Sequence, residues 1–187
     1  ASQALYMDSA GVGQEWVDSY RCRAWVNFSM ISPTGTYTRS GNTVTVTMTA
    51  HGMETGQYVE LNFTSGSATD GYYQITVTDA NTFTIADPAS GATSGNVTRE
   101  VLVRASGNIA SVTAVNTGYA QVNFTSAMPD AFYAIVATGS KADFAASTAR
   151  IVTIIADQVT ASRFRVVTET NSATLIDLDY INIVIFR

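Results

Sequence analysis

Two aspartates near the C-terminal end have a spacing that carbohydrate chemistry could use. Asp177 and Asp179 stand two apart in "LIDLDY", so on a strand their side chains would share one face. Hydrolysis of a glycosidic bond requires two carboxyl groups, one to donate a proton and one to act as nucleophile or base. Acids at strand ends are also common where they only cap turns or repel neighbouring sheet edges. The pair therefore predicts no catalytic site, and a glycan hydrolase remains only a remote alternative.

Other groups able to do chemistry are few. His51, the single histidine, sits in the expected turn "TAHGMETG", and any Ser–His–Asp triad would have to use it. Cys22 is the single cysteine, which excludes an internal disulfide and a multi-cysteine metal site. Asp70, Asp79 and Asp87 fall in expected loops without the calcium-loop pattern. We therefore predict no catalytic residue, no cofactor and no metal ligand, and a protein that is not an enzyme.

Aromatic side chains offer binding rather than catalysis. The chain contains nine tyrosines, eight phenylalanines and two tryptophans. In a small β domain most such rings belong to the core or to a subunit interface. Tyr58 and Tyr72 are the two that we predict as candidate receptor contacts, because tyrosine combines an apolar ring with a polar tip.

Composition and charge narrow the range of partners. Only 13% of the 187 residues are charged, and the net charge is −5. No cluster of lysine or arginine exists, which argues against nucleic acid. No apolar run approaches the roughly 18 residues of a membrane span. The first twenty residues lack the basic start and apolar stretch of a signal peptide, so we expect an unexported chain without membrane insertion.

Period-two alternation predicts an all-β fold. Val44, Val46 and Met48 alternate with threonines, and similar short runs follow at roughly ten-residue spacing through residue 99. This spacing is typical of a small antiparallel barrel or sandwich. Residues 100–187 continue with strand-like runs, and only 140–148 offers a short helix or a loop. Residues 32–42 and 86–95 are interpreted as breaks, because they are rich in glycine, proline and small polar residues.

The sequence Asn-Phe-Ser/Thr occurs three times, at 27–29, 62–64 and 123–125. The intervals are unequal and the flanking sequences differ, which argues against a structural repeat. We interpret the three copies as strand ends, with Phe28, Phe63 and Phe124 on an apolar face.

The first twenty residues form an apolar arm. Such a segment is expected to lie on its own domain, on a sister subunit or on another protein, because exposed apolar surface is costly in water. The arm residues predicted to make these contacts are Leu5, Tyr6, Val12, Trp16, Val17 and Tyr20.

Four segments together resemble the C-terminal domain of many tail-fibre and related virion proteins of tailed phages. They are "AWVNF" (24–28), "VRASGNIASVT" (103–113), "YAQVNFTSAMPDAFY" (119–133) and the terminal "INIVIFR" (181–187). The segment between the first two, with "AHGMETGQYVELNFTSG", "DGYYQITVTDANTFTI" and "SGNVT", is similar to a small β module found in phage structural proteins. The resemblance implies a trimeric protein.

These observations predict three parts. Residues 1–22 form the N-terminal arm, residues 23–32 with 100–187 form an antiparallel β-sandwich, and residues 33–99 form an inserted small β barrel or sandwich. The sheet edges and the apolar arm also favour self-association.

The expected function is that of a non-enzymatic structural protein on the exterior of a bacteriophage virion. Heptads, collagen-like repeats and shaft repeats are absent from the sequence, which favours a trimeric capsid decoration or cement protein anchored by its arm and sandwich. The alternative is a short tail fibre that adheres to a glycan or protein of the host surface. Both alternatives predict contact with other virion proteins and assembly in the host cytoplasm.

Overall fold

The computed structural model describes residues 5–7, 13–15, 21–142 and 149–187. Nearly all of its regular structure is β, with one short 3-10 helix, η1 (Ala156–Gln158). The all-β prediction is therefore confirmed, and the antiparallel sheets pack as a sandwich. The described part of the chain contains no helix with the length and apolar character needed to cross a membrane.

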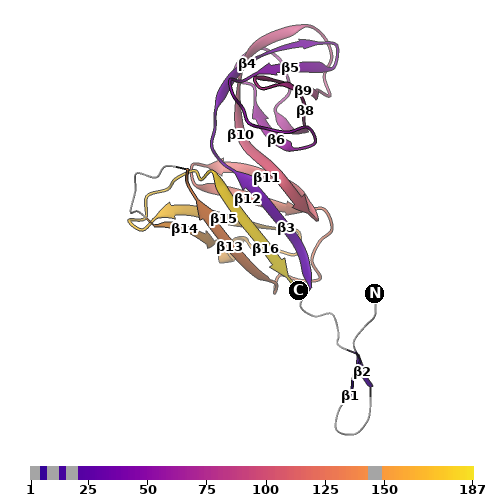
Figure 1. Ribbon diagram of the computed structural model, residues 1–187, viewed down its shortest axis with the longest axis vertical. Coiled ribbons are helices and arrows are strands. Elements are labelled where there is room, and N and C mark those ends of the chain that lie inside the picture. Colours follow the sequence, from indigo (N-terminus) through magenta and orange to yellow (C-terminus); the bar gives the residue numbers. More distant parts are fainter. Residues whose placement is uncertain (1–4, 8–12, 16–20, 143–148) are drawn as a thin grey trace.

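The sandwich consists of two four-stranded layers (Figure 1). The first layer has the order β13 (Ala134–Ser140), β16 (Tyr180–Phe186), β3 (Cys22–Ser29) and the second half of β10 (Thr93–Gly107). The second layer has the order β11 (Ile109–Asn116), β12 (Tyr119–Phe124), β15 (Arg163–Thr170) and β14 (Arg150–Ile154). All neighbouring strands are antiparallel, and segments from both ends of the chain lie side by side in the first layer.

The inserted part is a small barrel. Its strands are β4 (Thr34–Ser40), β5 (Thr43–Thr47), β6 (Tyr58–Asn62), β7 (Gly71–Gln74), β8 (Thr76–Asp79) and β9 (Thr82–Ala86), together with the first half of β10. Pairing runs from β6 through β10, β4, β5 and β9 to β8. Strand β7 directly precedes β8 in the chain and pairs with β6. This pairing joins the two ends of the strand order and closes the barrel.

Strands β7 and β8 are separated only by Ile75, although Tyr73, Ile75 and Val77 alternate with polar residues as in a single strand. The side chain of Ile75 is buried, and its amide donates to the carbonyl of Gln57 at 3.0 Å. Its carbonyl accepts from the amide of Gly56 at 2.9 Å. The loop before β6 therefore replaces the sheet partners of Ile75, and the strand changes neighbours at this point.

Strand β10 joins the two parts. Its first residues pair with β4, its middle residues with β6, and its last residues with β3. The boundary expected between residues 99 and 100 thus falls within a continuous strand. The prediction that residues 93–95 belong to a loop is wrong, because Gly95 pairs with Tyr37 of β4 and allows the carbonyl of Ser65 to approach closely.

The break expected at residues 32–42 is also wrong in its middle, because β4 occupies Thr34–Ser40. Gly35 lies in this strand and not in a turn. A Cβ at this position would stand 2.3 Å from the carbonyl oxygen of Thr47. The glycine is therefore required by the close approach of β5, and it disguises the strand in the sequence.

Each part has its own hydrophobic core. Phe28 and Phe124 belong to the sandwich core, whereas Phe63 packs against the barrel core. The three Asn-Phe copies thus mark strand ends from two different cores. Alternation is the reason, since Asn27, Asn62 and Asn123 each lie on the opposite face of the strand from the phenylalanine that follows.

Strands β1 (Leu5–Met7) and β2 (Gly13–Glu15) pair with each other in a separate two-stranded sheet. Of the arm residues predicted to make contacts, Leu5 and Tyr6 lie in β1, where only the backbone is described. The remaining four, Val12, Trp16, Val17 and Tyr20, lie outside the described residues. The end of the expected helix or loop, residues 143–148, also lies outside them.

Candidate functional site: the cavity between barrel and sandwich

A cavity of about 650 Å³ opens where the barrel meets the sandwich. It is bounded by β6 and the start of β7 from the barrel, by β10, and by the end of β11 with the turn that follows it. Pockets of this size that lie between two folded units are common ligand sites. The polar side chains of its lining are Ser32, Glu60, Asn62, Asp70, Glu100, Asn116, Thr117 and Asp177.

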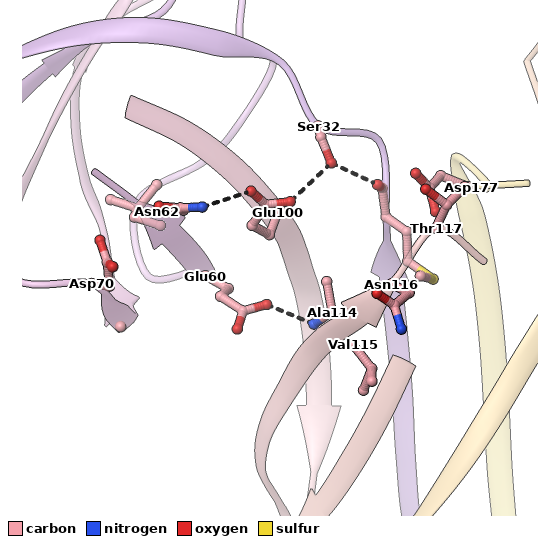
Figure 2. A pocket seen from close by; sticks show the side chains of 13 residues that line it. Ser32, Glu60, Asn62, Asp70, Glu100, Ala114, Val115, Asn116, Thr117 and Asp177 are labelled. Carbon is pink, nitrogen blue, oxygen red and sulfur yellow. Dashed lines mark hydrogen bonds between the residues drawn. The ribbon is translucent and has the colours of Figure 1, made fainter. Parts of the chain in front are cut away.

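Glu60 spans the cavity from one part to the other. On β6, Val59 and Leu61 face the barrel core, so alternation turns Glu60 outward toward the sandwich. Its Oε2 accepts a hydrogen bond of 2.7 Å from the backbone amide of Ala114 on β11 (Figure 2). Burial raises the pKa of the Glu60 carboxyl, the Ala114 hydrogen bond opposes this, and the nearby Glu100 raises the pKa further.

Glu100 lies on β10 beside this contact. Its two carboxylate oxygens accept long hydrogen bonds, at 3.5 Å from the amide of Asn62 and at 3.4 Å from the hydroxyl of Ser32. Ser32 belongs to the segment between β3 and β4, so this carboxylate holds that connection against β6 and β10.

Asp70 and Asp177 lie on opposite sides of the cavity (Figure 2). The carboxylate of Asp70 accepts from the amide of Phe63 at 2.6 Å and closes the loop between β6 and β7. The carboxylate of Asp177 accepts from the amide of Gly118 at 2.8 Å in the turn between β11 and β12. Both carboxylates therefore line the cavity and also accept a backbone hydrogen bond that stabilises a nearby loop or turn.

The expectation that Asp177 and Asp179 share the face of a strand is wrong. Both residues precede β16, and Leu178 between them is buried in the sandwich core. Asp177 faces the cavity, while Asp179 accepts from the amide of Ala142 at 2.9 Å. The two carboxylates accept hydrogen bonds from different segments, Asp177 from the turn before β12 and Asp179 from the segment after β13.

His51 and two of the loop aspartates, Asp79 and Asp87, make contacts that stabilise turns and the barrel. The Nδ1 of His51 accepts from the amide of Met53 at 3.0 Å, and its ring stands edge-on to Phe83 at 5.5 Å between centroids. Asp79 accepts from the amide of Asn81 at 2.8 Å, in the turn between β8 and β9. Asp87 is buried in an ion pair with Arg39, at 2.6 Å.

Tyr58 and Tyr72 lie against each other beside the cavity. Their rings are stacked with centroids 5.2 Å apart and planes 9° from parallel. Tyr72 packs on the sandwich core, and burial, followed by the proximity of Tyr58 and Glu60, strongly raises the pKa of its hydroxyl. Tyr58 keeps 37% of its surface exposed. Of the two predicted receptor contacts, Tyr58 therefore offers more surface to a partner.

Glu60 and Glu100 are site residues that sequence reasoning missed. Glu60 could have attracted notice as a carboxylate in the middle of the apolar strand "YVELN". Nothing in the sequence indicates that β11, more than fifty residues later, supplies its hydrogen-bond donor. The cavity lies where β10 passes from the barrel to the sandwich, and its lining comes from segments that are far apart in the sequence.

The lining favours ligands that donate hydrogen bonds. It contains four carboxylates, two primary amides and two hydroxyls, and its described residues include no lysine, arginine or histidine. An anionic ligand would be repelled, whereas a neutral polyhydroxylated ligand or a cationic group would find acceptors. Among the residues that the structure describes, no group of three or more histidine, cysteine, aspartate or glutamate side chains could hold a metal ion.

Comparisons with protein-family models, with curated proteins and with solved structures find no match for this chain.

Proposed function

We propose that this protein is a non-enzymatic structural component of the exterior of a tailed-phage virion, in which the sandwich anchors the molecule and the barrel projects. The observation that carries the proposal is the uneven distribution of exposed apolar side chains. Among the described residues, seven of the eight large hydrophobic side chains that are exposed belong to the sandwich. They are Trp25, Val115, Phe132, Val136, Ile151, Leu175 and Tyr180.

The barrel has the opposite surface. Its one exposed large hydrophobic residue is Tyr58, beside the sandwich. Residues 34–98 are all described, and their exposed charged side chains, Glu54, Asp70 and Asp79, are all acidic. Arg39, the one lysine or arginine in this range, is buried. A polar surface with charge of one sign resists association, so the barrel suits the end that faces solvent and the sandwich the end that binds other proteins.

The resemblance of the sandwich segments to virion proteins of tailed phages supports the same assignment. It favours a homotrimer that contacts other virion proteins, as a capsid decoration or cement protein. The fold is compatible with this role, because β10 connects anchor and projecting part without a flexible linker (Figure 1).

Binding to virus particles tests the proposal directly. Purified protein is expected to bind particles of the encoding phage that lack it, and to raise the temperature at which those particles disrupt. Imaging of particles with labelled protein then distinguishes head from tail. Absence of binding at micromolar concentration, with the protein folded, would reject a structural role on the virion.

The cavity favours a second candidate function, adhesion to the host surface as a short tail fibre. Its carboxylates and amides could accept hydrogen bonds from the hydroxyl groups of a neutral glycan, and Tyr58 lies close by. A glycan-binding screen is expected to show neutral sugars bound and sialylated or phosphorylated sugars rejected. Glu100→Gln should weaken such binding, and Asp157→Asn, a substitution on exposed η1, should not. Binding that is equally strong with anionic sugars would contradict this candidate.

A further inference from the structure

The outward face of the first sandwich layer carries apolar side chains that remain exposed among the residues that the structure describes. One row of paired residues runs straight across the sheet, from Val136 of β13 through Val184 of β16 and Trp25 of β3 to Gly107 of β10. Val136 is 55% exposed and Trp25 is 42% exposed. We call this row and the row beside it the outer sheet face.

The second row of the outer sheet face is polar but almost uncharged. It contains Thr138 of β13, and it continues through Asn182 and Asn27, whose side-chain amides hydrogen-bond to each other. At its margin the guanidinium of Arg104 lies over the ring of Tyr180, 4.7 Å from the centroid. All residues of these four strands are described, and none of those in the two rows is an acid. A protein of net charge −5 thus keeps its carboxylates off this face.

The segment that precedes β3 has the complementary composition. Residues 1–20 contain Asp8, Glu15 and Asp18 and no lysine or arginine. The same residues are rich in apolar side chains, among them Leu5, Trp16 and Val17. An acidic and apolar segment matches a face that has Arg23 and Arg104 on its strands and an apolar row at its centre.

The chain route places this segment next to the outer sheet face. Arg21 still belongs to the end of the sheet, because its carbonyl accepts from the amide of Arg187 at 3.2 Å. The stretch from Gln14 to Arg21 contains neither glycine nor proline at which the chain could readily reverse onto its own sheet. These eight residues can span roughly 25 Å when extended, enough to reach an adjacent molecule.

We propose that residues 1–20 of a neighbouring copy cover the outer sheet face, so that the subunits are joined by exchanged arms. The inference rests on the proposed self-assembly of the protein and adds the surface that receives the arm. Apolar arm residues cover the row from Val136 to Trp25, and the acids of the arm approach the arginines at its margin. The face thereby loses the exposed apolar area that a lone molecule would leave in water.

The test uses the full chain, a chain that lacks residues 1–20, and a synthetic peptide of residues 1–20. All core residues that the structure describes lie within residues 24–187, so the shortened chain retains them. Light scattering is expected to show an oligomer for the full chain and a monomer for the shortened chain. The peptide is expected to bind the shortened chain, more weakly as salt is added. A peptide with Asp8→Asn, Glu15→Gln and Asp18→Asn should bind more weakly and with little salt dependence.

Substitutions locate the binding surface. Val136→Asp and Thr138→Asp, both at exposed positions of β13, should each weaken peptide binding at least tenfold and reduce the oligomer of the full chain. Thr153→Asp, at an exposed position on the outside of the second layer, is the matched control and should change neither. Far-ultraviolet circular dichroism and the melting temperature verify that each variant is folded.

Three results would overturn the inference. The first is that removal of residues 1–20 leaves the number of subunits in the oligomer unchanged. The second is that the peptide binds Val136→Asp as tightly as it binds the unaltered surface. The third is that the full chain is a monomer and hydrogen exchange shows its outer sheet face protected by its own arm. Binding to virus particles is measured separately. Exchanged arms without particle binding would reject only the proposed virion role, and particle binding by a monomeric chain would reject only the exchange.

Discussion

Gly107 lies directly beneath the indole of Trp25. The two residues are partners across β10 and β3, and a Cβ at position 107 would stand 2.4 Å from the indole nitrogen. Trp25 is partly exposed, yet its ring packs on the backbone of β10, because Gly107 has no side chain that would occupy this space. The glycine in "VRASGNIASVT" is therefore explained by packing across the sheet.

We expect Gly107→Ala to lower the free energy of unfolding by about 1–2 kcal/mol, because the added methyl group must displace the indole. Urea denaturation measures the change, with Ala105→Ser on the same strand as the control. In a Trp25→Ala background the methyl group meets no ring, so Gly107→Ala should then cost much less. An equal cost in both backgrounds would show that the indole is not the cause.

Asn108, the next residue, connects three segments. Its side-chain amide donates to the carbonyls of Arg23 and Ser126 at 3.2 and 3.1 Å, and its side-chain oxygen accepts from the amide of Ser126 at 2.7 Å. Its φ of 56° lies in the left-handed region, which asparagine tolerates better than most residues.

Asn108→Ala should lower the free energy of unfolding by about 3 kcal/mol, through lost hydrogen bonds and through the left-handed backbone. Asn108→Gly retains the backbone freedom and loses only the hydrogen bonds, so it should be the milder of the two by about 1 kcal/mol. Thermal and urea unfolding of both variants check the order. A glycine variant as stable as the original protein would show that the hydrogen bonds contribute nothing.

Asp87 and Arg39 form the buried ion pair of the barrel. Asp87 is 2% exposed and accepts hydrogen bonds from the amides of Ala89 and Thr69 as well as from Arg39. Burial alone would raise the pKa of its carboxyl, but these donors together lower it to about 2. Asp87→Asn leaves the Arg39 charge buried without its partner and should lower the free energy of unfolding by about 3 kcal/mol. Asp157→Asn, an exposed acid, is the control in the same urea titration.

The same pair predicts how the stability of the protein changes in acid. The folded-state pKa of Asp87 lies below the value of 3.8 for a free aspartate, so the unfolded chain takes up the proton first. The stabilisation is therefore fully present above about pH 4 and is lost as the pH falls toward 2, an effect of about 2 kcal/mol. Urea unfolding at pH values between 5 and 2 should show this loss in the original protein and not in Asp87→Asn. Parallel curves for the two proteins would contradict the prediction.

Glu60 should affect stability with the opposite sign. Because burial raises the pKa of its carboxyl, the folded protein binds the proton more tightly than the unfolded chain. The corresponding stabilisation is complete below the unfolded pKa near 4.5 and is lost as the pH rises through the higher folded value. Glu60→Gln should therefore be at least as stable as the original protein at pH 7. Its advantage should disappear at pH 4, and a glutamine variant that is less stable at pH 7 would refute the prediction.

Much of the local structure follows from the sequence. Val44 and Val46 alternate with threonines and are fully buried in the barrel core, while the intervening Thr45 is not. The same rule places Ile181, Ile183 and Ile185 inside the sandwich. Alternation predicts the burial of these residues correctly because each strand has one face on a core and one face outside it. Successive residues therefore alternate between apolar and polar side chains.

The errors arise where a strand changes partners or where a glycine is needed for close approach. Gly35 and Gly95 resemble turn residues in the sequence, yet both lie in strands where another backbone comes within contact distance of the missing Cβ. Asp177 and Asp179 have the spacing of a shared face, but Leu178 between them is buried and the chain is not a strand there. The order of adjacent residues does not predict which distant segments of the chain will pack against them.

The sequence by itself determined an all-β chain with two apolar cores, an acidic net charge and few residues capable of catalysis, because these properties depend on composition and on the order of adjacent side chains. Only the tertiary structure decided that β10 belongs to both the barrel and the sandwich, and that Glu60 reaches the amide of Ala114 across the cavity. The same holds for the outer sheet face, which unites β3 with β16 from the other end of the chain. Pairing between strands that are far apart in sequence depends on the fit of whole sheets, which a residue and its neighbours in sequence do not encode.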